Sequence, residues 1–182
     1  EQIIDHETDR AERAAGMDHY VTIGLEPKEA NYREMAEEVL DRFPEYLDRD
    51  PVVGVGEIGY DQQTDDEDYA FRRQLQMAEE RELPVIIHTP HEDKRSGTER
   101  IVDVIEDEGV TQDRIVIDHN TEGSDEMILN SAAHWDPSDP LAVPKARDKM
   151  LDRGWDREEV RKVVFENPYD FFDRSPNFDY EP

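Results

Sequence analysis

Three short apolar segments of the chain each end on a side chain that can bind a metal ion. They are residues 52–57, 84–88 and 115–119, which end on Glu57, His88 and His119. Each segment is short and rich in Val or Ile, which is typical of a buried strand. The intervals from Glu57 to His88 and from His88 to His119 are both 31 residues, about the length of one βα unit. This spacing predicts consecutive parallel strands that end at the same level.

The side chains near these strand ends follow the two-residue alternation of a strand. The expected shared faces are Val53, Val55 and Glu57 on the first strand, Ile86 and His88 on the second, and Ile115, Ile117 and His119 on the third. Because strand side chains alternate between two faces, each polar group would then stand above apolar neighbours. We therefore expect Glu57, His88 and His119 to converge on one point.

Helical segments separate these strands along the chain. Helical periodicity predicts helices over residues 2–15, 30–47, 65–82 and 98–108, and an additional strand over 19–25. In the second helix we expect Met35, Val39, Leu40, Phe43 and Leu47 to face inward. Strands that alternate with helices predict an α/β fold, with a parallel sheet and the helices outside.

The regular spacing breaks down after His119. Only seven residues separate His119 from the next apolar segment, residues 127–131, whereas a parallel crossover needs a dozen or more. Either this strand is antiparallel or a βα unit is absent, and we favour absence. Eight such units give roughly 250 residues, the size of a TIM barrel. We therefore expect one TIM-barrel-type (β/α)8 domain over 1–182, incomplete and lacking strands before residue 1 and between about 122 and 125.

The composition is strongly acidic. The 48 Asp and Glu residues against 21 Lys and Arg residues give a net charge of −27, spread along the whole sequence. Such a surface around ordinary Val and Ile strands predicts a halophilic, cytoplasmic protein, because concentrated salt screens the repulsion between like charges. The absence of Cys excludes thiolate ligands. No signal peptide or long apolar run indicates export or a membrane.

The order of motifs resembles one family of enzymes. Residues 53–61, 71–75, 83–88 and 117–119 follow one another as in TatD-related metal-dependent hydrolases, an amidohydrolase-like group with TIM-barrel folds. The resemblance is greatest to the archaeal branch, and it includes the later segments 130–140 and 165–168. It implies a hydrolase with one or two divalent metal ions at the carboxyl end of the barrel.

The resemblance also implies roles for individual residues. Glu57 matches a carboxylate that binds or bridges the metals, and His88 and His119 match histidine ligands. The family's His-x-His motif does not occur in this sequence. His134 stands about where the resemblance places a last catalytic Asp, with Asp136 and Asp139 nearby. Either His134 is itself a metal ligand and catalytic residue, or a neighbouring carboxylate such as Asp139 takes this role.

The residue types agree with hydrolytic metal chemistry. Imidazole and carboxylate ligands without thiolate suit Zn²⁺, Mn²⁺ or Mg²⁺, and an open coordination position would activate water against an ester, amide or phosphodiester. The resemblance implies a small-molecule or phosphodiester substrate, as in a deoxyribonuclease. The charge of −27 gives nucleic acid no support. A non-catalytic barrel that binds a metal or ligand is the alternative, and the sequence does not indicate an oligomeric state.

Overall fold

The computed structural model describes residue 6 and residues 19–90, 92–117 and 142–181. The chain divides into two compact units. The first comprises residues 1–120 and 172–182, and the second comprises residues 121–171. The expectation of one domain over 1–182 stays a prediction, and each unit is described separately below.

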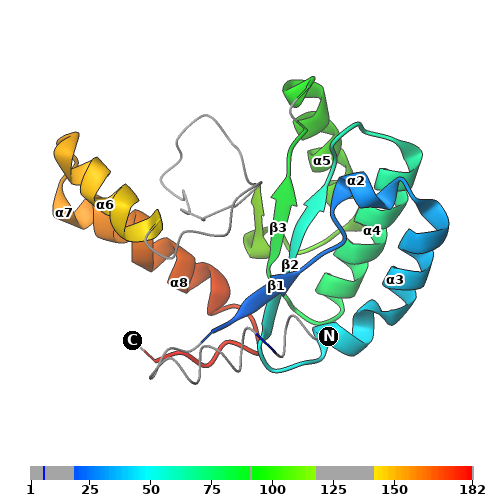
Figure 1. The fold of residues 1–182 in the computed structure, drawn as a ribbon, viewed down its shortest axis with the longest axis horizontal. Helices are drawn as coiled ribbons and strands as arrows, with labels where there is room; N and C mark the ends of the chain where they lie inside the picture. The colour runs from blue at the N-terminus through cyan, green and yellow to red at the C-terminus, as the bar shows by residue number, and fades with distance from the viewer. Residues whose placement is uncertain (1–5, 7–18, 91, 118–141, 182) are drawn as a thin grey trace. The chain divides into compact units, whose positions relative to one another are not determined.

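The first unit contains a four-stranded parallel sheet with the strand order β1-β2-β3-β4 (Figure 1). The strands are β1 (Val21–Ile23), β2 (Val52–Gly59), β3 (Val85–His88) and β4 (Ile115–Ile117). Each strand lies beside the next one in the sequence, which is the order that repeated βα units produce. The described strands form an open sheet, so the four of them do not close a barrel.

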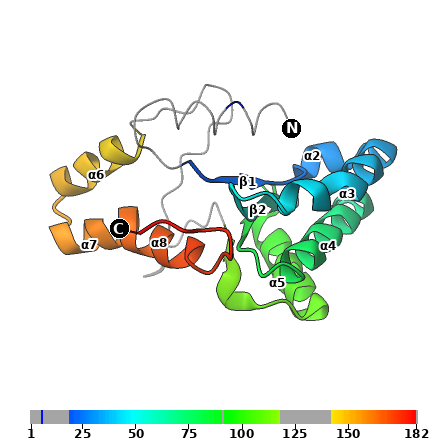
Figure 2. The ribbon, with the colours of Figure 1, turned by 90° about the horizontal axis from the view of Figure 1, so that it is seen from below.

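Helices connect the strands of this unit. They are α2 (Pro27–Ala30), α3 (Arg33–Leu47), α4 (Asp65–Glu79) and α5 (Lys94–Glu108), and the short 3-10 helix η1 (Gln112–Arg114) precedes β4. Figure 2 shows α3, α4 and α5 side by side along one face of the sheet. The helices α3, α4 and α5 begin near their predicted residues, although α5 begins at Lys94 rather than residue 98 and α4 ends at Glu79 rather than residue 82. The helix predicted over residues 2–15 lies outside the described residues.

An apolar core lies between the sheet and these helices. Its members include Leu40, Phe43, Leu47, Val55, Ile58, Phe71, Leu75, Ile87, Ile101 and Val104. The expectation that Met35 and Val39 face this core is wrong, since their exposed fractions are 44% and 38%. The inward stripe of α3 is Ala36, Leu40, Phe43 and Leu47, which follows the 3.6-residue period more closely.

The C-terminal segment of the first unit packs against the amino ends of β1 and β2. The Asn177 side-chain amide donates a hydrogen bond to the carbonyl oxygen of Val52 over 2.8 Å, and the Tyr20 and Phe178 rings lie 4.8 Å apart. These contacts join residues more than a hundred positions apart in the sequence. They hold the C-terminal segment at the amino ends of these strands, which lie opposite the carboxyl ends that carry Glu57 and His88.

The described part of the second unit is helical. It consists of α6 (Ala142–Asp152), α7 (Arg157–Arg161), the π-helical stretch η2 (Lys162–Glu166) and α8 (Asn167–Phe172), whose last residue belongs to the first unit. Its buried apolar side chains include Val160, Val163 and Phe171. Within the residues that the structure describes, no helix combines the length and apolar character needed to cross a membrane.

Candidate metal centre

The pairing of β2 with β3 is irregular immediately before the two strands end. Val55 pairs with Val85 and Ile58 pairs with Ile87, so β2 advances three residues while β3 advances two. The additional residue forms a β-bulge at Gly56 and Glu57. A bulge re-aims the side chains that follow it, and here it places Glu57 beside the end of β3.

Two glycines allow the strands to approach closely at this bulge. Gly56 has φ +153°, and a Cβ atom there would lie 2.8 Å from both Cβ and the carbonyl oxygen of Ile86. Gly59 has φ +133° and pairs with His88, and a Cβ atom on Gly59 would overlap the His88 carbonyl oxygen. Residues with side chains rarely adopt these φ values. The Gly-Glu-Ile-Gly sequence is therefore needed to bring Glu57 to His88.

The structure brings Glu57 and His88 together at the carboxyl ends of two neighbouring strands. Glu57 Oε2 and His88 Nδ1 lie 3.4 Å apart, and the exposed side-chain fractions are 28% for Glu57 and 10% for His88. This separation exceeds the 2.7–3.2 Å typical of an N–H···O hydrogen bond. Two ligands of one tetrahedral metal ion, with bonds of about 2.0–2.1 Å, are separated by roughly 3.3 Å. The two side chains therefore fit a shared metal ion.

The face occupied by Glu57 differs from the expectation in one respect. Val55 pairs with Val85 and belongs to the core under the helices, whereas Glu57 lies beside His88 on the other face of the sheet. The expectation that Val55 shares a face with Glu57 is wrong, because the bulge after Val55 breaks the two-residue alternation. The shared face of Ile86 and His88 agrees with the regular pairing of β3 with β4.

The third expected ligand lies outside the described residues. Ile115 and Ile117 pair with Val85 and Ile87 and pack against the same core, so their side chains lie on the face opposite His88. His119 follows two positions later, in a segment that the structure does not describe. Its convergence with Glu57 and His88 stays a prediction.

His134 and Asp139 also lie outside the described residues, as does Asp136. Across residues 19–90, 92–117 and 142–181, no group of three or more metal-binding side chains is found. Among the described residues, the candidate site therefore consists of Glu57 and His88, as two candidate ligands. A carboxylate and an imidazole are ligands that suit Zn²⁺ and Mn²⁺.

A buried carboxylate organises the loop that follows β2. The Glu67 side chain is fully buried and accepts hydrogen bonds from the backbone amides of residues 61–64, the shortest from Gln63 over 2.7 Å. The Asn31 side-chain amide donates to the same carboxylate over 2.9 Å. Thr64 and Glu67 also form the capping box that begins α4. The spacing Thr-x-x-Glu in the sequence is a signal from which this role could have been predicted.

A network of charged groups contacts the same loop, which follows β2. The buried Tyr60 hydroxyl donates to Asp68, which also accepts hydrogen bonds from Arg72 and from Arg100, at 2.8 and 3.0 Å. The Arg100 guanidinium lies 4.7 Å from the centre of the Tyr60 ring and donates to the carbonyl oxygen of Gln63. Sequence reasoning missed this network, because its members are brought together only by the packing of α4 and α5.

Burial and hydrogen bonding shift the pKa values in this network. Burial raises the pKa of Tyr60 far above its ordinary value, and the hydrogen bond to the Asp68 carboxylate raises it further. Burial alone would raise the pKa of Asp68, but the hydrogen bonds from Tyr60, Arg72 and Arg100 outweigh burial and lower it. Asp68 is therefore ionised near neutral pH and holds the loop after β2 in place.

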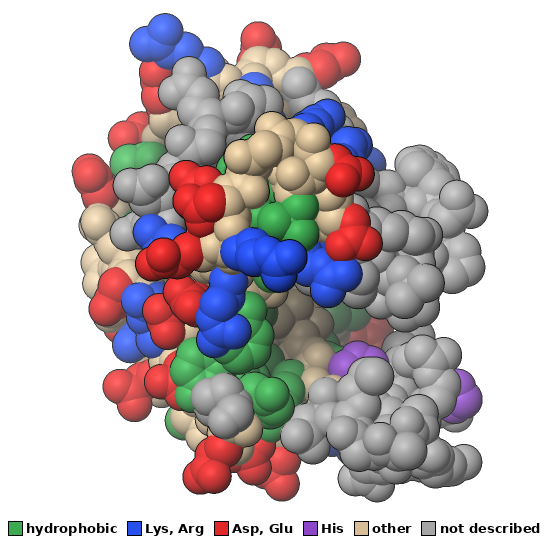
Figure 3. Space-filling model, turned by 90° about the vertical axis from the view of Figure 1, so that its left-hand side faces the viewer, with side chains coloured by type: hydrophobic (Ala, Val, Ile, Leu, Met, Phe, Trp, Pro, Cys, Tyr) green, Lys and Arg blue, Asp and Glu red, His purple; other side chains and the backbone are tan. Residues whose placement is uncertain are grey.

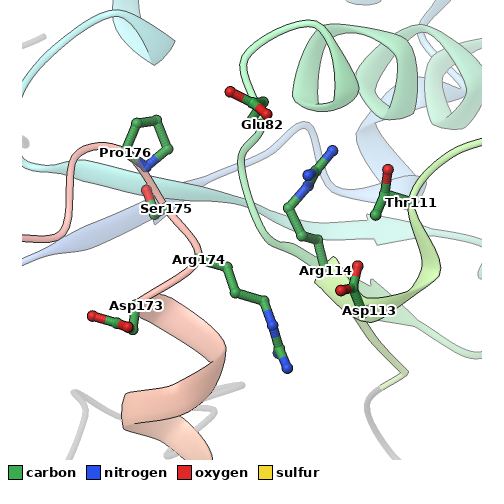
Figure 4. Close-up of a pocket in the computed structure, with 8 residues that line it drawn as sticks. All are labelled: Glu82, Thr111, Asp113, Arg114, Asp173, Arg174, Ser175 and Pro176. Atoms are coloured by element: carbon green, nitrogen blue, oxygen red, sulfur yellow. The ribbon is translucent and has the colours of Figure 1, made fainter.

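A cavity of about 380 Å³ lies at the end of the sheet opposite Glu57 and His88. Figure 4 shows its two sides, with Glu82, Thr111, Asp113 and Arg114 on one and the C-terminal residues 173–176 on the other. Glu82 precedes β3 and Arg114 precedes β4, so the cavity lies at the amino ends of these strands. It is thus separate from Glu57 and His88, which lie at their carboxyl ends.

Residues 4–134 match the family described as TatD related DNase, which is well over half of the chain. The chain belongs to the TatD-related DNase family. This agrees with the resemblance of its strand-end motifs and shows that it is of the metal-dependent hydrolase type.

Two curated relatives carry matching names. An uncharacterised metal-dependent hydrolase of Methanocaldococcus jannaschii is 26% identical over 205 residues, which cover 94% of this chain and 80% of that protein. An uncharacterised metal-dependent hydrolase of Bacillus subtilis is 35% identical over 95 residues, which cover 50% of this chain and 34% of that protein. These names imply a divalent metal, and they specify neither its identity nor the number of ions.

A solved structure supports the fold. The crystal structure of a TatD-like protein from Archaeoglobus fulgidus superimposes with a TM-score of 0.59 and 22% identity, covering 88% of this chain and 75% of that one. The predicted fold class, an α/β fold of the TIM-barrel type, is confirmed. The halophilic and cytoplasmic expectations stay predictions.

Proposed function

We propose that this protein hydrolyses phosphodiester bonds, as a deoxyribonuclease does, with one or two divalent metal ions bound at the carboxyl ends of the strands. The observation that carries the proposal is the 3.4 Å separation between Glu57 Oε2 and His88 Nδ1. It occurs in a chain that belongs to the TatD-related DNase family. Zn²⁺, Mn²⁺ and Mg²⁺ are the candidate ions.

Glu57 and His88 would hold the ion, and His119 would be a further ligand. When bound, a divalent cation supplies a Lewis acid that polarises a phosphoryl oxygen and lowers the pKa of water. The His88 side chain is almost fully buried, so the sheet fixes the orientation of its imidazole. Glu57 is more exposed, which leaves its side of the pair open to a substrate. The bulge and its glycines hold the carboxylate against the imidazole.

His134 and Asp139 are the candidates for moving the proton. A carboxylate at Asp139 would accept the proton of the attacking water, and His134 would bind metal or donate to the leaving group. Their roles can be separated by kinetics. We expect His134→Ala to lower metal affinity if this side chain is a ligand, and Asp139→Asn to lower kcat with unchanged metal affinity.

The test of this function is hydrolysis of bis-p-nitrophenyl phosphate in the presence of Mn²⁺, Zn²⁺ or Mg²⁺. We expect turnover that a chelator abolishes. Loss of an outer-shell metal partner costs roughly 10–100-fold, so Glu57→Gln and His88→Ala should cost more than about 100-fold. Both variants should also weaken metal binding in calorimetry. The matched controls are Glu99→Gln and His6→Ala, which change exposed side chains far from the pair in sequence.

The alternative function is a barrel that binds a metal or ligand without turnover. This alternative rests on one feature of the sequence, which contains no His-x-His motif. It predicts a folded protein that binds metal but hydrolyses neither phosphodiesters nor carboxylic esters nor lactones. That result would reject the catalytic proposal.

A further inference from the structure

Two polar side chains are buried on the inner face of α4. Glu67 and Gln74 have exposed fractions of 0% and 1%, whereas Figure 3 shows Asp and Glu side chains exposed at many points on one face of this acidic protein. The two residues lie seven positions apart, about two helical turns, so both side chains leave α4 on the same side. Burying a polar group costs free energy unless it is hydrogen-bonded. Each of the two therefore needs partners inside the first unit.

Glu67 meets this need with a run of backbone amides. The amides of residues 61–64 all donate to its carboxylate, that of Gln62 to both oxygens, and the Asn31 side-chain amide is a further donor. A carboxylate has about four acceptor sites, so these donors saturate it. Successive backbone amides that turn inward form the kind of concavity that binds anions. Glu67 is thus an internal anion around which the loop after β2 is wrapped.

Gln74 and Asn31 attach the segment after β1 to the same helix. The Leu25 amide donates to Gln74 Oε1 over 2.6 Å, and Gln74 Nε2 donates back to the Leu25 carbonyl oxygen over 3.3 Å. Asn31 accepts from the Thr64 hydroxyl over 2.6 Å, while its amide donates to Glu67 over 2.9 Å. The segments that follow β1 and β2 are therefore both fastened to one face of α4.

The loop held by Glu67 is continuous with the backbone that meets His88. It begins directly after Gly59 and Tyr60. Gly59 pairs with His88, and the Tyr60 amide donates to the His88 carbonyl oxygen over 3.4 Å. A shift of the loop would move this backbone contact. Because the His88 imidazole lies 3.4 Å from the Glu57 carboxylate, even a small shift would change how the two side chains face each other.

We propose that Glu67 is a positioning residue for the metal centre, which holds the loop of residues 61–64 so that the His88 imidazole stays aligned with Glu57. The inference rests on the proposed metal-dependent hydrolysis, since it names the group that keeps the two candidate ligands aligned. Glu67 acts through the backbone, because its hydrogen bonds go to the loop and to Asn31. It touches neither the ion nor the substrate.

The variant Glu67→Gln tests this role, because it keeps the size of the side chain but turns an NH₂ group toward the backbone amides. We expect the Kd for Mn²⁺, measured by calorimetry without substrate, to rise about 10-fold, the lower end of the range for groups that orient metal ligands. With bis-p-nitrophenyl phosphate, kcat should fall while KM changes little. Amide hydrogen exchange of residues 61–64 in the metal-free protein should become faster.

The matched control is Glu79→Gln on the same helix. Glu79 also accepts from a backbone amide and an arginine, with distances of 3.0 Å to the Thr111 amide and 2.9 Å to Arg114, but these residues precede β4 at the amino ends of the strands. We expect Glu79→Gln to lower the Tm without changing the Kd for Mn²⁺. The proposal is overturned if both variants lose metal affinity equally, or if a folded Glu67→Gln variant keeps the wild-type Kd.

Asn31→Ala carries the same test if Glu67→Gln does not fold, because it removes one donor and leaves the carboxylate in place. We expect it to raise the Kd for Mn²⁺ by less than 10-fold, and an unchanged Kd would overturn the proposal.

The outcomes separate this proposal from the proposed function. A protein that hydrolyses nothing, but whose Glu67→Gln variant binds Mn²⁺ more weakly, supports the positioning role and rejects the phosphodiesterase. A protein that hydrolyses the substrate, and whose Glu67→Gln variant keeps both kcat and the Kd for Mn²⁺, supports the phosphodiesterase and rejects the positioning role.

Discussion

Arginine is used differently in the sheet unit and in the turn between α6 and α7. In the sheet unit Arg72, Arg100 and Arg114 each form ion pairs that join neighbouring elements, at distances between 2.7 and 3.5 Å. At the turn Arg153 and Arg157 are exposed and form no such pair with any residue that the structure describes. A paired arginine positions a loop, whereas an unpaired one is available to a ligand. The ion pairs of Arg72, Arg100 and Arg114 therefore serve the architecture of the sheet unit.

The largest expected effect comes from the close approach of β2 and β3. Gly59→Ala should abolish hydrolysis and lower the free energy of unfolding by about 1–3 kcal/mol or more, because φ +133° is strained for Ala and its Cβ would overlap the His88 carbonyl oxygen. Urea denaturation and the phosphodiester assay measure the two effects. Gly109→Ala is the control, with φ +64° but no atom within 4 Å of its Cβ. Equal losses of activity and stability in both variants would contradict a role for the close approach of β2 and β3.

The next largest expected effect concerns Asp68 and the groups that it binds beside the loop after β2. Asp68→Asn should lower the free energy of unfolding by about 1–3 kcal/mol, because Tyr60, Arg72 and Arg100 lose a charged acceptor. The control Glu99→Gln removes a carboxylate whose pair with Arg95 is exposed, and such pairs contribute about 0–1 kcal/mol. Chemical denaturation compares the two variants. If both variants lose a similarly small free energy of unfolding, the hydrogen-bonded Asp68 contributes no more to stability than an exposed ion pair does.

The acid dependence of stability should follow from the lowered pKa values. The hydrogen bond from Arg72 lowers the pKa of Glu108, and the network around Tyr60 lowers that of Asp68. A carboxyl whose pKa is lower in the folded state stabilises the protein above its unfolded value, about 4, and this contribution is lost as pH falls. We expect the urea midpoint to fall between about pH 5 and pH 2, and less steeply in Asp68→Asn. An equal slope in both proteins would contradict this.

The smallest expected effect lies in the turn. Arg153→Ala and Arg157→Ala should each change the free energy of unfolding by less than about 0.5 kcal/mol, because neither side chain has a partner to lose. Thermal melts of these variants beside Arg72→Ala test the comparison directly. If the turn variants destabilise the protein as much as Arg72→Ala does, the cations of the turn are structural.

Much of the site could be predicted from sequence because its cause is local. The spacing of the segments that end in Glu57 and His88 predicted parallel strands, and the apolar periodicity of residues such as Phe71 and Leu75 predicted the helices that cover them. Periodicity is a property of neighbouring residues, so it can be read without knowing what each element packs against. The Gly-Glu-Ile-Gly sequence marked the end of β2 for the same reason.

The tertiary structure decided which face each of these side chains occupies. The bulge at Gly56 and Glu57 depends on the pairing of β2 with β3, and it placed Val55 in the core although alternation put it beside Glu57. The contact of Tyr60 with Asp68 and Arg100 depends likewise on how α4 and α5 pack. A strand register and a helix contact are set by atoms far apart in the chain. Composition and local pattern therefore fixed the elements and their order, while packing between elements set the geometry of Glu57 and His88.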